Sequence, residues 1–424
     1  MWVINLSFTS KEHRPKERVN DPSLRRQTVC FGCAYGVYYG IYCLFLSFMV
    51  TYLTTAGYSP IFCGVAGTVT YLISILTQPL MGYLTDSVLS IRRCLQIATV
   101  VTLAGTALLP GVLSRRSVLL LVLTVVAGVT IPMMSLLDVW VLAVKENTPK
   151  LNYPLVRAWG SLAYGCTSLI MGKLVQQHGI RPIFQVQIVF CLLLILILHW
   201  LPEISMHNRT RGSGTLSLST SLRIICADHG FRFAVILMLL HWLTHRMIGS
   251  YLALLVQAVG GDTSAFGIVT GLGGYAEIII PLFGYRWIRR CPLDRLLLIC
   301  LAINFVRPVF CWLSLPFGTA FFAAGQIIQS VGFSIYFTAS VECLSRLVPY
   351  QIKNTAISLG LALSSLLGTV LANFAGGLLI EFFGSLSTIP VTLMLGCVNI
   401  VWLFTQSRRF PQLKKSIDEC ADIV

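Results

Sequence analysis

The chain has 424 residues, of which 56% are hydrophobic and only 11% are charged, and its mean hydropathy is +0.79. This composition excludes an ordinary soluble globular domain. The formal net charge of +15 suggests nucleic acid as a partner, but the basic residues flank apolar runs of about 20 residues, each long enough to cross about 30 Å of hydrocarbon. We therefore predict an all-α polytopic membrane protein with no nucleic-acid partner.

Twelve apolar runs predict twelve transmembrane helices in two groups of six. The first group covers residues 29–51, 61–82, 94–112, 118–144, 153–175 and 183–201; the second covers 231–258, 265–284, 296–314, 319–344, 355–380 and 387–405. We expect an N-terminal six-helix bundle over 29–201, a linker over 202–230 and a C-terminal bundle over 231–405, with polar tails at 1–28 and 406–424. Two groups of six helices indicate pseudo-symmetric halves around a central pathway.

The basic residues lie mainly on one side of these predicted helices. Of the 31 Lys and Arg residues, 24 fall on the side of the tails and the linker, 4 on the other side and 3 inside the membrane. This bias places both termini in the cytoplasm and predicts a multi-pass protein of the cytoplasmic membrane. The basic surface also attracts anionic membrane lipid, and we expect a monomer.

The first predicted helix carries a cluster of tyrosines. Spacings of three, four and seven residues put three of the four phenols on one stripe; the four are Tyr35, Tyr38, Tyr39 and Tyr42. Phenols at this depth either face a polar cavity or form an aromatic belt at the interface. Tyr38 and Tyr42 are therefore candidates for a binding site, with the belt as the alternative.

The turn after the second predicted helix is charged. A small residue, Gly82, allows a neighbouring helix to approach. The carboxylate of Asp86 can accept hydrogen bonds from a nearby helix N-terminus, and Arg92 and Arg93 lie at the membrane surface. From the residues alone this is a charged turn between two helices.

The fourth and fifth predicted helices each carry one charge. Asp138 lies roughly 12 Å before the connecting turn and Arg157 roughly 8 Å after it, at about 1.5 Å per residue. In antiparallel neighbours the two therefore reach similar depth. An isolated charge there costs at least about 2.5–3.5 kcal/mol, which favours an ion pair or a wet cavity. The alternative is that Asp138 faces the headgroups and Arg157 extends to the surface.

The seventh predicted helix carries His241, His245 and Arg246. The two histidines are four residues apart and share one face. His245 or Arg246 can bind an anionic substrate or relay a proton. A metal site is a rival interpretation, but seven histidines in the whole chain leave too few in the membrane for a multi-histidine centre. A third possibility pairs Arg246 with an acid such as Glu277. We predict no metal and no cofactor.

The charged turn carries a family resemblance. With the Gln-Pro before it, the stretch Gly82-Tyr-Leu-Thr-Asp86 and Arg92-Arg93 resembles the helix 2–3 loop of the major facilitator superfamily, G-x-x-x-D-x-x-G-R-R, especially its lactose permease and phenylpropionate permease-like group. Ser87 stands where a basic residue is usual, and the glycine of the turn is missing. The resemblance implies the major facilitator fold, a transporter and not an enzyme, and a gating role for Gly82, Asp86, Arg92 and Arg93.

The same resemblance assigns roles to five intramembrane positions. Asp138 and Arg157 fall on the acid–arginine pair of the group's sugar site, and Tyr164 falls on its ring-stacking tryptophan. Glu277 matches a glutamate important to recognition and coupling, and Arg307 matches an arginine of the proton-coupling network. The resemblance therefore implies a binding and coupling site shared by both halves.

The tenth predicted helix departs from the group. Gln329 stands where the group commonly has a histidine, and the group's proton carboxylate aligns near Gly332. Glu342, at the end of the helix, is a candidate substitute. Otherwise coupling falls to Asp138 or Glu277.

These features together predict a secondary active transporter. It moves a small polar or carboxylate-bearing solute by alternating access, and the resemblance implies proton-coupled uptake, with protons as the second ligand. Three intramembrane arginines against two deep acids favour a carboxylate over a cation. Proton-antiport efflux and uncoupled facilitation are alternatives, and a membrane-embedded metal enzyme using the histidines is a different class. No GxxxxGK[ST] loop for nucleotide occurs, which argues against ATP-driven pumping.

Overall fold

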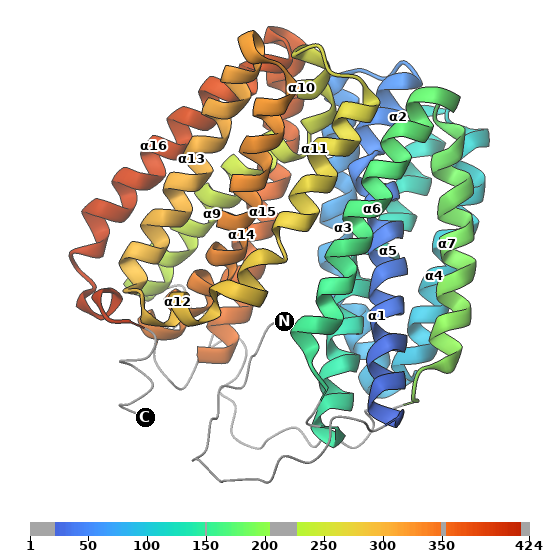
Figure 1. The fold of residues 1–424 in the computed structure, drawn as a ribbon, viewed down its shortest axis with the longest axis horizontal. Helices are drawn as coiled ribbons and strands as arrows, with labels where there is room; N and C mark the ends of the chain where they lie inside the picture. The colour runs from blue at the N-terminus through green and yellow to red at the C-terminus, as the bar shows by residue number, and fades with distance from the viewer. Residues whose placement is uncertain (1–21, 149–150, 204–226, 349–352, 417–424) are drawn as a thin grey trace.

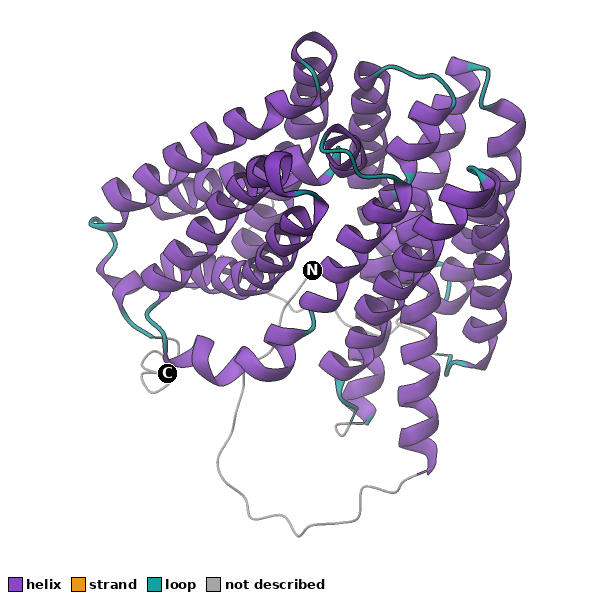
Figure 2. Ribbon diagram, turned by 45° about the horizontal axis from the view of Figure 1, so that its top comes forward, coloured by secondary structure: helices purple, strands orange, loops and turns teal. Residues whose placement is uncertain are grey.

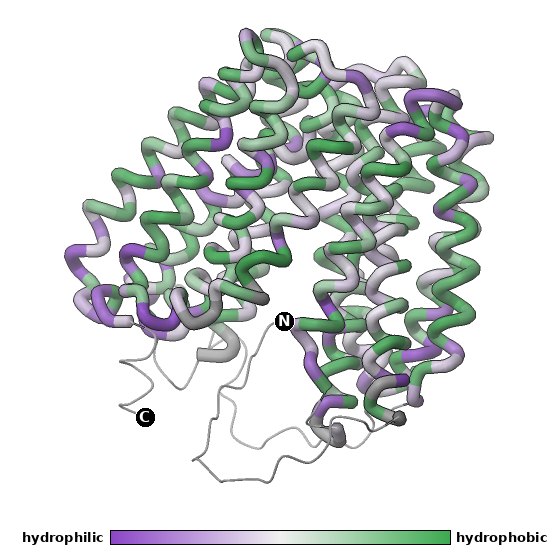
Figure 3. Tube along the Cα trace, in the orientation of Figure 1, coloured by the Kyte–Doolittle hydropathy of each residue, from purple (hydrophilic) through white to green (hydrophobic). Residues whose placement is uncertain are grey.

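The computed structural model describes residues 22–148, 151–203, 227–348 and 353–416. This part of the chain consists of helices and short loops and contains no β-strand (Figures 1 and 2). Apolar residues follow most of each helix, and hydrophilic residues gather mainly near the helix ends (Figure 3). The predicted all-α membrane class is confirmed. Residues 1–21 and 417–424 of the predicted tails and most of the linker lie outside the described residues.

The helices of the first half follow the predicted runs. They are α1 (Pro22–Tyr42), a π-helical turn (Cys43–Ser47), α2 (Met49–Thr55), α3 (Pro60–Ser87), α4 (Ile91–Val112), α5 (Arg116–Asn147), α6 (Tyr153–His178) and α7 (Arg181–Trp200). Short polar side chains start several of them: Ser59, Ser90 and Asn152 each accept a hydrogen bond from the backbone N–H three residues later.

The second half repeats this order with two interrupted spans. Its elements are α9 (His229–Gly249), α10 (Leu252–Ala258), α11 (Thr263–Ala276), a π-helical turn (Ile280–Gly284), α12 (Tyr285–Arg290), α13 (Leu293–Phe317), α14 (Thr319–Leu347), α15 (Lys353–Phe383) and α16 (Thr388–Ser407), with short 3₁₀ turns at Ser385–Ser387 and Pro411–Lys414. The first and seventh predicted spans are both broken, the former near Phe48 and the latter near Ser250.

Ten helices of the described residues are long and apolar enough to cross a membrane. The two predicted spans outside this set are α6 and α11, so the count of twelve stays a prediction for them. These two helices pack against each other, with the Ser168 hydroxyl donating to the Gly267 carbonyl at 3.1 Å. α11 has only 14 residues, from Thr263 to Ala276, which is short for a membrane crossing.

Three apolar clusters show how the halves are joined. One cluster comes only from the first half and includes Phe31 and Trp140; a second comes only from the second half and includes Leu297. The third contains residues of both halves, such as Phe48 and Phe266, whose rings meet edge to face at 5.2 Å. It lies where α2 and α10 are found, at the top of Figure 1. We call this the shared end, and the opposite end, where α1 begins and α16 finishes, the divided end.

Two glycine crossings bring the halves together at the shared end. A Cβ atom on Gly64 of α3 would lie 3.2 Å from the Cα of Gly377 in α15, and one on Gly172 of α6 would lie 2.7 Å from the Cα of Gly267 in α11. Only glycine allows backbones to approach so closely. The two crossings correspond to each other in the repeat. The early helix α3 of the first half meets the late helix α15 of the second, and the early helix α11 of the second half meets the late helix α6 of the first. The predicted domain limits themselves stay a prediction.

Each crossing is extended by a side chain that reaches a helix N-terminus of the other half. The Glu381 carboxylate accepts from the Ile61 backbone N–H at 3.4 Å. In the same way, the Gln176 side-chain oxygen accepts from the Thr263 N–H at 3.1 Å. Free N–H groups at helix starts favour such acceptors. The shared end is therefore closed by backbone approach, capping and a common apolar core.

Candidate functional site

A cavity of about 460 Å³ lies between the two halves. This volume is in the range of sites for small molecules. Eight of the predicted site residues line it: Tyr42, Asp138, Tyr164, His245, Arg246, Glu277, Arg307 and Gln329. Ser47 and Ser250, at the breaks of the first and seventh predicted spans, line it as well. Irregular backbone at membrane depth is tolerated where it borders a polar cavity.

The acid of the first half is held by several donors. Asp138 accepts hydrogen bonds from the Tyr35 hydroxyl at 2.5 Å and the Tyr153 hydroxyl at 2.8 Å. The Arg157 guanidinium lies 3.4 Å from its other carboxylate oxygen and also donates to Tyr153 at 3.1 Å. The predicted contact between Asp138 and Arg157 is present. Tyr153 is a member of this network that the sequence did not single out.

Two predicted site residues are absent from the cavity wall. Arg157 does not line the cavity, but its ion-pair partner Asp138 does. Tyr38 is fully buried in the first half, where its hydroxyl donates to the Thr130 carbonyl at 3.1 Å. The cavity role predicted for Tyr38 therefore does not hold, because the rotation of α1 turns its neighbour Tyr39 to the cavity instead.

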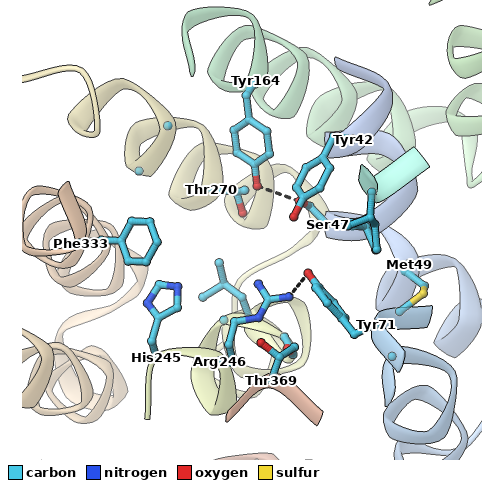
Figure 4. A pocket seen from close by; sticks show the side chains of 18 of the residues that line it. Tyr42, Ser47, Met49, Tyr71, Tyr164, His245, Arg246, Thr270, Phe333 and Thr369 are labelled. Carbon is cyan, nitrogen blue, oxygen red and sulfur yellow. Dashed lines mark hydrogen bonds between the residues drawn. The ribbon is translucent and has the colours of Figure 1, made fainter. Parts of the chain in front are cut away.

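The second half contributes two arginines to the cavity. Arg307 is 2% exposed and donates to the His245 carbonyl at 3.1 Å and to the Gln326 side-chain oxygen at 2.8 Å. Arg246 donates to the Tyr71 hydroxyl, and its guanidinium carbon lies 4.8 Å from the centre of the Tyr71 ring (Figure 4). Within the described residues, neither guanidinium forms an ion pair with a carboxylate. Both are held by neutral acceptors in a membrane-spanning region.

Glu277, the acid that follows α11, is not paired with Arg246. Glu277 lines the cavity just after α11 ends. Within the described part of the chain no hydrogen bond or ion pair to its carboxylate is found, so the structure does not contain the alternative pair with Arg246. Glu342, the candidate substitute on α14, pairs with Arg346 at 2.7 Å and does not line the cavity. Glu277 is thus the carboxylate that faces the cavity without a protein partner among these residues.

The two histidines of α9 occupy different surroundings. His245 faces the cavity, contacts the Gln329 side-chain nitrogen through Nδ1 at 2.7 Å and stacks on Phe333 at 4.9 Å. His241 is buried and stacks on Tyr336 at 3.7 Å. The histidine rings are parallel, with centroids 6.4 Å apart, and do not converge on a common point. No group of three or more potential metal-binding side chains occurs in the described residues.

The predicted gating turn takes a different form from the one expected. α3 continues to Ser87, so Asp86 is in its last turn and is exposed, and no helix N-terminus among the described residues donates to it. A Cβ atom on Gly82 would meet nothing within 4 Å, so the expected close approach of a neighbour is absent here. Arg92 donates to the Leu201 carbonyl, and Arg93 is exposed. The bonds that Ser90 and Arg92 form with Leu201 and Glu203 join the turn to the end of the first half.

Comparison with known proteins gives one family. Residues 30–390 match the MFS_1 like family. Curated relatives include the uncharacterized transporter YwbF of Bacillus subtilis (strain 168), 21% identical over 59% of this chain and 60% of the relative, and a maltose permease of Geobacillus stearothermophilus, 24% identical over 54% and 57%. A probable 3-phenylpropionic acid transporter of Escherichia coli (strain K12) is 30% identical over 37% and 41%. The chain therefore matches about 60% or less of the length of these relatives.

Solved structures agree in fold. The nucleoside transporter NupG superposes with a TM-score of 0.76 over 91% of this chain and 99% of that one, at 14% identity. A peptide transporter POT in complex with sulfate gives 0.72 over 92% and 96%, at 12% identity. At these identities the likeness shows a shared fold, and it matches the two-bundle architecture predicted from the sequence.

The network around Asp138 generates a stability prediction. Asp138→Asn leaves Arg157 without its carboxylate, and losing one partner of a buried pair costs about 3–5 kcal/mol. Arg157→Gln is expected to be similarly costly, and the double variant should lose less than the sum of the two. SDS unfolding titrations in mixed micelles measure these free energies. Arg93→Gln, at an exposed arginine, is the control and should change the free energy of unfolding by less than about 0.5 kcal/mol. Additive losses in the double variant would contradict a coupled pair.

Proposed function

The chain belongs to the MFS_1 like family, and on that premise we propose that it is a secondary transporter of a small carboxylate-bearing solute that works by alternating access. The observation that carries this proposal is the pair of cavity arginines, Arg246 and Arg307, which have no carboxylate partner in the described residues. A charged side chain inside the membrane is costly unless it is paired or hydrated, so two arginines without a carboxylate partner point to a negatively charged ligand.

The arrangement of the two halves supports alternating access. They share an apolar core and two glycine crossings at one end and keep separate cores at the other. A cavity between them is then open to one side at a time if the crossings part while the divided end closes. The bias of basic residues assigns the divided end to the cytoplasm, so the present conformation is the inward-facing one.

The charges of the cavity favour a carboxylate as the substrate. Asp138 and Arg157 neutralise each other, which leaves Arg246, Arg307 and Glu277. With Glu277 protonated, the cavity holds two positive charges beside the His245 ring. Among the relatives' printed substrates, maltose is neutral and 3-phenylpropionic acid is an acid with an aromatic ring. The arginines favour the acid, and Phe333, whose ring stacks on His245, supplies an aromatic part of the same cavity wall.

Glu277 is the candidate for proton coupling. Asp138 is engaged by two phenols and a guanidinium, whereas the Glu277 carboxylate faces the cavity with no such partner among the described residues. A group that must gain and lose a proton in each cycle cannot be tied to a permanent partner. We infer proton symport through Glu277. Antiport efflux and uncoupled facilitation remain the alternatives, and each gives a different result in the assay below.

The rival interpretation as a membrane metal enzyme receives no support. The relatives carry the names of transporters and permeases. The His241 and His245 rings are stacked on aromatic neighbours instead of sharing a ligand position. The small-molecule partner we propose is therefore a transported solute.

The first test is substrate binding and uptake. A thermal-shift screen of small monocarboxylates, with 3-phenylpropionate and maltose included, identifies a ligand, and uptake is then measured in proteoliposomes. Arg307→Gln should raise the KM of the carboxylate about 10- to 150-fold, because a hydrogen bond to a charged group contributes about 1.5–3 kcal/mol. Arg115→Gln, on an exposed arginine away from the cavity, is the control and should leave KM unchanged. Uptake of a cation as the main activity, or an unchanged KM in Arg307→Gln, would refute the proposal.

The second test concerns the proton. Wild-type uptake of the identified carboxylate should be driven by an imposed inward proton gradient. Glu277→Gln should abolish this dependence and still permit exchange of labelled for unlabelled substrate, because the cavity and the arginines are intact. Asp138→Asn is the comparison variant. The uptake that remains in this variant should still depend on the proton gradient. If wild-type uptake does not depend on the proton gradient, the protein is a facilitator and not a symporter. If an inward proton gradient drives efflux of the substrate, the protein is an antiporter.

A further inference from the structure

One contact in the cavity wall joins the two halves through a charged group. Tyr71 belongs to α3 in the first half, and Arg246 belongs to α9 in the second. The guanidinium donates to the phenol oxygen and lies over the face of the ring (Figure 4). A hydrogen bond and a cation–π contact thus act between the same two side chains. The Ser47–Tyr164 hydrogen bond in the same cavity, at 2.7 Å, stays within the first half.

This contact is close to one of the crossings that close the shared end. Tyr71 follows Gly64 by two turns of α3, and Arg246 precedes Tyr251 by about 7.5 Å of chain at 1.5 Å per residue. The Tyr251 ring packs at this crossing: a Cβ on Gly64 would lie 2.7 Å from its hydroxyl, and one on Gly376 would lie 2.6 Å from a ring carbon. Tyr71 and Arg246 therefore tie α3 to α9 next to the crossing of α3 with α15.

The guanidinium of Arg246 is only partly used in this arrangement. Its Nε–H is buried without an acceptor, and its described partner is a neutral phenol. A guanidinium carries five N–H donors in a planar fork that fits a carboxylate through two parallel bonds. A carboxylate adds charge–charge attraction and a second parallel bond to what the neutral phenol oxygen offers as a single acceptor. A carboxylate entering the cavity would therefore displace the Tyr71 hydroxyl from Arg246.

We propose that the Tyr71–Arg246 contact is a latch operated by the substrate. In the empty cavity it ties α3 to α9 and stabilises the conformation with the shared end closed. A bound carboxylate takes over Arg246, and the release of Tyr71 lowers the cost of separating α3 and α15 at their crossing. Tyr71 is thus a positioning residue that links occupancy of the cavity to conformation. The tie between α3 and α9 in the empty cavity is independent of the proposed function, whereas its release by the substrate rests on a carboxylate substrate.

The latch and a direct binding role for Tyr71 predict opposite changes in affinity. If the phenol competes with the substrate for Arg246, its removal strengthens binding; if it binds the substrate, its removal weakens binding. The probe is 3-phenylpropionate, with isothermal titration calorimetry on the purified full chain. Tyr71→Phe keeps the ring and removes the hydroxyl, and it should lower Kd about threefold to tenfold. An unchanged or higher Kd overturns the latch.

A second background shows whether the effect passes through Arg246. In Arg246→Gln, which removes the guanidinium, adding Tyr71→Phe should change the Kd of the probe by less than about twofold, since no competition remains. A lowering as large as in the wild-type background would overturn the assigned partner. If the weakened binding of Arg246→Gln prevents titration with this probe, the exchange measurement below decides.

Hydrogen–deuterium exchange of the empty protein tests the latch without any ligand. Tyr71→Phe and Tyr71→Leu should increase exchange about threefold or more in α2 and α10, which lie at the shared end. Ser47→Ala is the matched control, because it removes a cavity hydrogen bond within one half, and it should leave exchange at α2 and α10 unchanged. Equal exchange in wild type and both Tyr71 variants overturns the latch. If exchange increases but no carboxylate binds the wild type, the tie between α3 and α9 stands, whereas its release by a carboxylate and the proposed substrate class both fall.

Discussion

Two guanidinium groups without a carboxylate partner among the described residues are the constraint on which the rest of this structure depends. Arg246 and Arg307 sit at membrane depth, where an unpaired charge is costly, and they are held by a phenol, a backbone carbonyl and a side-chain amide. Such acceptors satisfy some of the N–H groups but do not neutralise the charge. Both groups line the cavity between the two halves, next to the break in the seventh predicted span.

In the first half, by contrast, the intramembrane arginine has a carboxylate partner. Its arginine is neutralised by Asp138, and Tyr35 and Tyr153 complete the coordination of that acid. The network joins α1, α5 and α6 to one another, and other phenols of this half, such as Tyr39, Tyr42 and Tyr71, line the cavity. The two walls of the cavity therefore differ in charge. The wall formed by α9 and α13 is cationic, and the wall formed by α1 and α3 is rich in phenols. A solute with one carboxylate and a less polar remainder fits that distribution of charge.

Much of this architecture follows from sequence patterns, and the failures have physical reasons. Apolar runs locate the helices because burial in hydrocarbon depends on length and composition alone. The depth of Asp138 and Arg157 follows from counting residues across one short turn. Helix rotation is not determined by such counting: Tyr38 and Tyr39 are adjacent, and only packing decides that Tyr39 faces the cavity. Tyr71 lies in an apolar run with no signal of its own, because its partner comes from the other half of the chain. The extension of α3 through Asp86 was missed since a charged turn and a charged last helical turn have the same composition.

The central claim is that the cavity selects for negative charge. It is tested most directly by isothermal titration calorimetry of the purified protein with a small monocarboxylate and with the primary amide of the same acid, which has nearly the same shape and no charge. The arginines predict that the carboxylate binds at least about tenfold more tightly than the amide, and that the preference weakens with added salt. Equal affinities, or tighter binding of the amide, would contradict the account.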